Sequence, residues 1–193
     1  MSTDKYASFY EEAPTFSEAI AALEDKECPE QVVTDILSFK ILPTDDGTIG
    51  DRLTKYYYLL PAGIQNRVLS SDALDQIFNV YIEWIDDDIE DSSYIYATEM
   101  VELFEGTFCG LLEQENLSSE TLSNFAKTIE KLSKALTDLQ DSGLEEDLSF
   151  WQYYGWLAPI FEALAAHPNS TKEQKEKCLE LAERMKTKEA EAE

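Results

Sequence analysis

Apolar residues recur at helical spacing along most of the chain. In the clearest case they are three or four residues apart, at Leu122, Phe125, Ile129, Leu132, Leu136 and Leu139. These steps place one narrow apolar stripe along the side of a helix. Alternation of apolar and polar residues, which is typical of a half-buried strand, is scarce. The pattern therefore predicts an all-α protein.

Start and stop signals divide the chain into successive helices. Thr15 and Glu18 have capping-box spacing, and Pro29 followed by Glu30 is typical of a first helical turn. Further helices are expected over residues 49–61, 71–85 (capped by Ser71), 93–115, 118–140, 144–166 (kinked at Pro159) and 171–185. The acidic run from Asp86 to Asp91 is expected to break the helix before it and to form an exposed turn.

Short connections between successive helices favour antiparallel neighbours. The expected architecture is a set of antiparallel helical hairpins that form either a bundle or a short stack of the HEAT or armadillo kind. No repeat of fixed period distinguishes the two. We expect one α-helical domain over residues 1–185 and a frayed, charged tail over residues 186–193. The expected core residues are Phe78, Tyr81, Phe104, Phe108, Leu132, Leu136, Trp151 and Leu157.

The negative charge is large and uneven. The chain has 40 acidic and 15 basic residues and a formal net charge of −25, and residues 1–117 form the more acidic half. Residues 68–126 contain 14 Asp and Glu without any Lys or Arg. Large apolar residues in the same stretch argue against a disordered acidic tail. A folded surface of this sign repels nucleic acid and anionic membranes, and it favours a basic protein as partner.

The candidate partner-binding site combines carboxylates with aromatic anchors. The carboxylates are Asp72, Asp75, Glu83, Asp86, Asp87, Asp88, Glu90 and Asp91, and the aromatic anchors are Tyr56 and Tyr57. Three consecutive tyrosines, residues 56–58, cannot all face the same side of a helix. Most of the aromatic residues are expected in the core, while one or two exposed rings would suit a protein interface.

Catalytic, metal and cofactor sites find little support in the sequence. The single histidine, His167, stands at a predicted helix end, where a surface or helix-capping role is expected. The three cysteines are far apart and form no Cys-x-x-Cys pair, so reduced thiols are expected. Phosphate-binding glycine loops are absent from the sequence. We therefore expect a protein that is not an enzyme, with no catalytic residues, no metal and no cofactor.

Residues 88–99 resemble a calcium loop in their spacing. Oxygen donors stand at positions 1, 3, 5, 7 and 12 of an EF-hand pattern, as Asp88, Glu90, Ser92, Tyr94 and Glu99. Ser93 occupies position 6, where the sharp turn of an EF-hand requires glycine. A calcium-binding helical protein is therefore the lesser alternative.

The leading hypothesis is a non-enzymatic, acidic α-helical binding protein that engages a basic protein client as an escort or chaperone. The main alternative is an inhibitor or immunity-type protein that mimics the charge of nucleic acid against a nucleic-acid-binding enzyme. The sequence signal is the same for both. With no leader-like or membrane-spanning apolar segment, a cytoplasmic location is expected, with the nucleus as an alternative. The sequence specifies neither the partner nor an oligomeric state.

Overall fold

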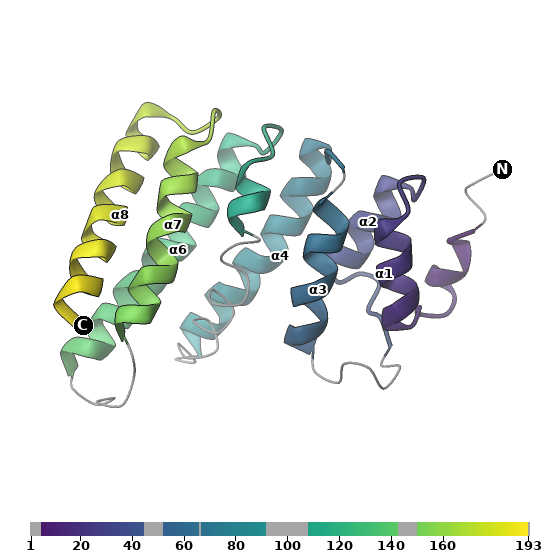
Figure 1. Cartoon of the computed structure of the whole chain (residues 1–193), viewed down its shortest axis with the longest axis horizontal. Helices are drawn as coiled ribbons and strands as arrows, with labels where there is room; N and C mark the ends of the chain where they lie inside the picture. The colour runs from purple at the N-terminus through teal and green to yellow at the C-terminus, as the bar shows by residue number, and fades with distance from the viewer. Residues whose placement is uncertain (1–4, 45–51, 66, 92–107, 143–149, 193) are drawn as a thin grey trace. The chain divides into compact units, whose positions relative to one another are not determined.

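The computed structural model describes residues 5–44, 52–65, 67–91, 108–142 and 150–192, and these ranges confirm the all-α class (Figure 1). In chain order the helices are the 3-10 helix η1 (Ala7–Tyr10), α1 (Phe16–Glu24), α2 (Glu30–Leu37), α3 (Arg52–Ile64), α4 (Ser71–Glu90), α6 (Ser119–Ser142), α7 (Phe150–Ala166) and α8 (Lys172–Ala192). A further helical turn covers residues 108–112. Within these ranges we find no strand, and no helix combines the length and apolar character needed to cross a bilayer.

The chain divides into two compact units, Met1–Val80 and Tyr81–Glu193. We call them the N-terminal unit and the C-terminal unit. The division falls within α4, so this helix contributes its first half to one unit and its second half to the other. Two compact units that share a helix can belong to one domain or to two. The single domain expected over residues 1–185 therefore stays a prediction.

Local sequence signals determine the helix starts in the N-terminal unit. The capping box of α1 is confirmed, with Glu18 N–H donating to Thr15 Oγ1 and Thr15 N–H donating to Glu18 Oε2. The cap of α4 is Ser70 rather than the expected Ser71, because Ala73 N–H donates to Ser70 Oγ. Ser70 in turn donates from its own N–H and hydroxyl to the carboxylate of Glu30 at the start of α2. Two helix starts are thereby joined.

Helix α3 continues through Pro61 to Ile64, although the sequence pattern predicted an end at Pro61. Proline lacks the N–H that would bond one turn back. The lost bond is the one to the carbonyl of Tyr57, and the pattern resumes after the proline, since Gln65 N–H donates to the carbonyl of Pro61 at 3.0 Å. Gly63 lies in the last turn of α3, and a Cβ atom built on it would lie 2.6 Å from Leu37 Cδ1 of α2. This glycine therefore permits a close approach between α2 and α3.

The C-terminal unit is organised around aromatic rings and a helical hairpin. Tyr81 of α4 contacts Phe108 edge-on with ring centroids 5.6 Å apart, and Phe108 contacts Phe125 of α6 at 5.2 Å. Helix α7 packs extensively against α8, which runs antiparallel beside it (Figure 1). The expected core residues Phe78, Tyr81, Phe108, Leu132, Leu136 and Leu157 are all buried. Phe104 and the side chain of Trp151 lie outside what the structure describes.

Two further expected helix ends are wrong. Helix α4 runs through Asp86 to Glu90 instead of breaking at the acidic run. Helix α8 extends to Ala192, so that the tail expected to fray from residue 186 is helical as well. Packing explains this extension, since Met185 is buried and Lys186 Nζ lies 2.6 Å from Glu162 Oε1 of α7.

A core truncation tests the packing of α6. Leu132 is fully buried, so Leu132→Ala should lower the free energy of unfolding by about 2–5 kcal/mol, measured by urea denaturation. Leu139 on the same helix is only half-buried, and Leu139→Ala serves as the matched control with a smaller loss. A loss below about 0.5 kcal/mol for Leu132→Ala would contradict the packing of this helix.

A pair of glycine substitutions tests the close approach of α2 and α3. Gly63→Ala should lower the free energy of unfolding by about 1–3 kcal/mol, because the new methyl group would overlap the buried side chain of Leu37. Gly155→Ala in α7 is the control, since its Cβ would meet only the flexible end of Glu189. We expect that variant to match the wild type or gain up to about 1 kcal/mol from helix propensity. Equal melting temperatures for both variants would refute the close approach.

Candidate partner-binding site

The candidate carboxylates lie on α4, with Asp91 directly after its end. Each helical residue advances the side-chain direction by roughly 100°. The buried side chains of α4, which are Ala73, Leu74, Ile77, Phe78, Tyr81 and Ile85, therefore occupy one side of the helix. Glu83, Asp87 and Glu90 point to the opposite side, and all three are exposed. Burial of the apolar side thus presents the carboxylates to solvent.

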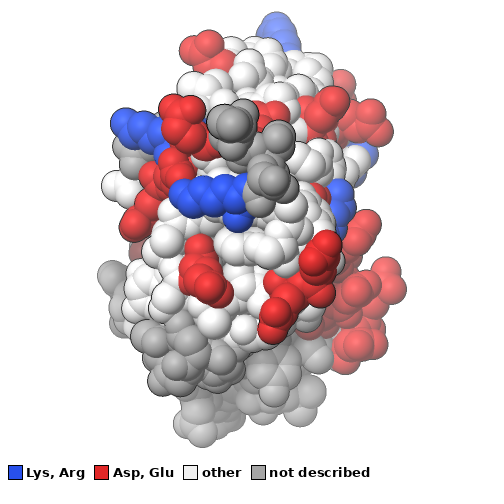
Figure 2. Space-filling model, turned by 90° about the vertical axis from the view of Figure 1, so that its right-hand side faces the viewer, with Lys and Arg blue, Asp and Glu red and all other residues white. Residues whose placement is uncertain are grey.

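Four carboxylates of the C-terminal unit form what we call the acidic stripe: Glu83, Asp87, Glu90 and Asp91. All four are exposed, and none of them lies within ion-pair distance of a Lys or Arg in the described ranges. The N-terminal unit is also rich in acidic side chains, and Figure 2 shows one face with many carboxylates and few cations. The acidic stripe differs from such scattered charge because three of its members lie on one helix, and Asp91 follows directly, with its N–H donating to the carbonyl of Asp87.

Asp86 is bound within the unit rather than free. Its carboxylate accepts hydrogen bonds from Lys131 Nζ at 2.9 Å and from Thr128 Oγ1 at 3.1 Å, both on α6. Asp86 therefore fastens α4 to α6, and the expectation of an exposed turn there is wrong. The sequence could not indicate this role, because the two partners follow more than forty residues later in the chain.

Three other candidate carboxylates lie off the stripe. Asp88 is half-buried and lies on the apolar side of α4, three residues after Ile85 and seven after Tyr81. Burial raises its pKa, and the nearby charges of Asp87 and Asp91 raise it further. Asp72 and Asp75 belong to the N-terminal unit, where Asp72 is exposed. Asp75 is half-buried, and its Oδ1 atom has no hydrogen-bond partner among the described residues.

The acidic stripe reduces the stability of the helix that carries it. Backbone carbonyls at a helix C-terminus carry partial negative charge, so carboxylates there are unfavourable. The last turn of α4 contains no basic residue that would compensate. Like charges four residues apart, as in Glu83–Asp87 and Asp87–Asp91, each cost about 0.2–0.5 kcal/mol. This charge pattern therefore lowers the free energy of unfolding instead of adding to it.

The exposed aromatic residues lie on α3 in the N-terminal unit. Tyr57 and Tyr58 are 40% and 49% exposed, and their rings meet edge-on with centroids 5.1 Å apart. Leu59 and Leu60, which follow them, are fully buried. Tyr57, one of the two candidate anchors, is thus exposed. Tyr58 is exposed as well, although the sequence analysis did not include it among the candidate anchors. The side chain of Tyr56 lies outside the described residues.

His167 has a structural role that the sequence did not reveal. It follows the end of α7 as expected, but it is buried instead of lying at the surface. The N–H of Asn169 donates to Nδ1 at 3.1 Å, and Nε2 lies 3.1 Å from the carbonyl oxygen of Gln114, where it can only donate. Asn169 Nδ2 adds hydrogen bonds to the carbonyls of Glu115 and Leu117. His167 and Asn169 therefore tie residues 114–117 to the α7–α8 turn.

Other chemistry receives no geometric support from the described part of the chain. No group of three His, Cys, Asp or Glu side chains there could hold a metal ion. Positions 1 and 3 of the calcium-loop pattern, Asp88 and Glu90, lie in α4, while residues 92–99 lie outside the described ranges. Cys28 and Cys178 are buried, and burial raises the pKa of both thiols, which disfavours the reactive thiolate.

A substitution at Asp88 tests the electrostatic cost. The unfolded chain releases this proton near pH 4, whereas the folded chain retains it to higher pH. Ionisation of Asp88 therefore lowers the free energy of unfolding as pH rises through this range. Asp88→Asn should remove this decline, and relief of the like-charge pair with Asp91 should add about 0.2–0.5 kcal/mol at pH 7. Urea denaturation from pH 4 to 7 measures both effects.

The control for Asp88 is Glu180→Gln on α8, which removes an exposed carboxylate that makes no ion pair. Its unfolding free energy should follow that of the wild type across the pH range. A destabilised Asp88→Asn variant at pH 7 would show that the carboxylate makes a favourable contact.

Comparison with known proteins yields no relative: no family model, no curated protein and no solved structure matches the chain. The physical properties of the described surfaces are consequently the basis for assigning a function. Among them, the acidic stripe combines exposure, a rigid helical support and the absence of a described counter-charge.

Proposed function

We propose that this chain is a non-enzymatic acidic binding protein that engages a basic protein client as an escort. The observation that carries the proposal is the acidic stripe in the second half of α4 and directly after its end, whose four carboxylates are exposed and have no ion-pair partner within the described ranges. Lys and Arg side chains of a client would supply the missing counter-charge. Binding would also relieve the like-charge repulsion at the C-terminal end of this helix.

The stripe would act mainly on the rate of association. A surface of one sign attracts an oppositely charged partner over several ångströms and raises the association rate constant by about 10- to 1,000-fold. Salt weakens this attraction, since the Debye length is about 8 Å at 0.15 M. Asp86 is not part of the proposed contact, because Lys131 already neutralises it. The Tyr57–Tyr58 pair is a separate candidate anchor on the N-terminal unit.

Charge density supports the second candidate, an inhibitor that mimics nucleic acid. Residues 83–91 contain six carboxylates, and at 1.5 Å per residue they span about 12 Å of helix. One negative charge per about 2 Å approaches the value of about 1.7 Å for duplex DNA. Lys131 reduces this density by neutralising Asp86. The escort and the inhibitor would use the same stripe and differ in what the client does once bound.

A charge-reversal variant tests the proposal. Glu83, Asp87, Glu90 and Asp91 are all changed to Lys, and the full chain is used at 50 and 300 mM salt to capture client proteins, whose association with the purified chain is then timed. We expect a basic client whose association rate falls at least tenfold on charge reversal and falls steeply with salt. The stripe is exposed, so the variant should keep its helical content.

The matched control reverses four exposed carboxylates of the same unit that make no ion pair in the described ranges: Glu113, Glu115, Glu180 and Glu191. The total change of charge is equal, so any difference between the two variants reports position. A client that is neutral or acidic, and that binds both variants as it binds the wild type, would refute the proposal. If the captured client loses nucleic-acid binding or cleavage while it is bound, the inhibitor replaces the escort.

A further inference from the structure

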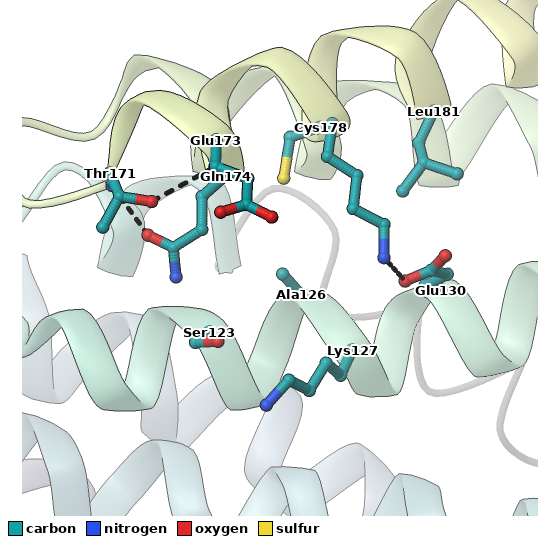
Figure 3. Close-up of a pocket in the computed structure, with 10 residues that line it drawn as sticks. Ser123, Ala126, Lys127, Glu130, Thr171, Glu173, Gln174, Cys178 and Leu181 are labelled. Atoms are coloured by element: carbon teal, nitrogen blue, oxygen red, sulfur yellow. Dashed lines mark hydrogen bonds and ion pairs between the residues drawn. The ribbon is translucent and has the colours of Figure 1, made fainter.

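A groove runs between α6 and α8 in the C-terminal unit (Figure 3). The two helices start close together, where Ser119 Oγ donates to the carbonyl of Asn169, and they run in the same direction. The groove has a volume of about 320 Å³. Its apolar part consists of Ala126, Cys178 and Leu181, and the last two are largely buried.

Cations gather along this groove. It continues along α6, and across both parts the basic lining residues are Lys127, Lys131, Lys134, Lys177 and Arg184. The acidic lining residues are Glu130, Glu173 and Asp138. The groove is therefore locally positive in a chain whose net charge is −25. A third of the basic residues of the sequence lie along it.

Two of the five cations have no counter-charge. Lys131 pairs with Asp86, Lys134 pairs with Asp138, and Lys177 pairs with Glu130 across the groove. Lys127 on α6 and Arg184 on α8 are exposed, and neither lies within ion-pair distance of a carboxylate in the described ranges. The groove thus presents one available cation on each of its two helices, beside an apolar strip.

We propose that the groove between α6 and α8 binds an acidic peptide segment of a partner protein. One carboxylate of the segment pairs with Lys127, a second pairs with Arg184, and an apolar side chain between them covers Ala126 and Leu181. Lining residues on α6 extend from Ser123 to Lys134, which corresponds to about 16 Å of helix. An extended segment of about five residues spans that distance. This surface is distinct from the acidic stripe and has the opposite sign.

The arrangement of the cations favours carboxylates over a phosphate group. Recognition of a phosphorylated residue uses clustered arginines that converge on one group carrying close to two charges. Here a single arginine and a lysine extend from different helices, and the three other lysines of the groove are already paired. Two separate single charges fit two separate carboxylates.

Fluorescence anisotropy with a defined probe tests the proposal. The probe is a fluorescein-labelled peptide of seven residues, in which Leu is flanked on each side by three alternating Glu and Asp residues. Titration of the full chain at 0.15 M salt should give saturable binding, because salt screens the overall negative charge beyond about 8 Å. A second peptide with Gln and Asn in place of Glu and Asp should not bind. Absence of saturable binding of the acidic peptide would overturn the proposal.

Variants separate the groove from general electrostatics. The double variant Lys127→Glu with Arg184→Glu should weaken binding at least tenfold. Its control, Lys172→Glu with Lys175→Glu, makes the same change of charge at α8 residues outside the groove lining and should alter affinity less than twofold. An equal loss in both double variants would overturn the proposal, since binding would then follow net charge alone.

A third variant tests the apolar strip. Ala126→Arg adds a positive charge and fills the groove opposite Cys178. If the segment lies in the groove, affinity should fall at least fivefold despite the added charge. Stronger binding would place the peptide elsewhere on the surface and contradict the proposal. Inorganic phosphate that competes with the peptide at low millimolar concentration, when chloride of equal ionic strength does not, would overturn it in favour of a phosphate site.

Discussion

The ring contacts that join Tyr81, Phe108 and Phe125 determine how α4 is oriented in the C-terminal unit. These rings come from α4, from the helical turn at residues 108–112 and from α6, and all three are fully buried. Edge-to-face aromatic pairs add about 0.5–1.5 kcal/mol to the burial of their area. Rotation of α4 would expose Tyr81 and bury charged residues. Packing of this one ring therefore holds Glu83, Asp87 and Glu90 in solvent.

Repulsion between the carboxylates at the C-terminal end of α4 opposes folding, and cations of the same unit offset only part of it. Asp86 finds compensation in Lys131 and Thr128, which also attach the helix to α6. Asp88 forms no ion pair within the described ranges, and burial together with the charges of Asp87 and Asp91 raises its pKa. The remaining carboxylates face solvent, where water and salt reduce the repulsion between them. Asp86 thus stabilises the packing of α4 against α6, whereas Glu83, Asp87, Glu90 and Asp91 are exposed to solvent.

The two surfaces of the C-terminal unit have opposite signs and different supports. The acidic stripe depends on one helix, so its geometry follows from helical spacing. The groove between α6 and α8 depends on two helices held together by α7 and by the Lys177–Glu130 ion pair. If both proposals hold, the chain binds a basic client on α4 and an acidic segment on α6 and α8, as an adaptor between two proteins would.

Short-range signals in the sequence determined the helices themselves. The capping box of Thr15 and Glu18 and the apolar seam of α6 were identified correctly, because each depends on residues three or four positions apart. The exposure of Glu83, Asp87 and Glu90 agrees with the acidic surface that composition suggested. The all-α class followed from the same helical periodicity. These features need no knowledge of distant contacts.

Only the tertiary structure decided the roles of Asp86, His167 and Lys127. Asp86 and His167 are defined by contacts with residues 42 to 53 positions away, and no local pattern specifies such pairs. The proposed role of Lys127 depends on a groove that α6 forms with α8, and both of these helices pack against α7. Sequence patterns report which side of a helix is apolar. Which charged side chain finds a partner, and which remains available for binding, depends on where other helices bring their own charges.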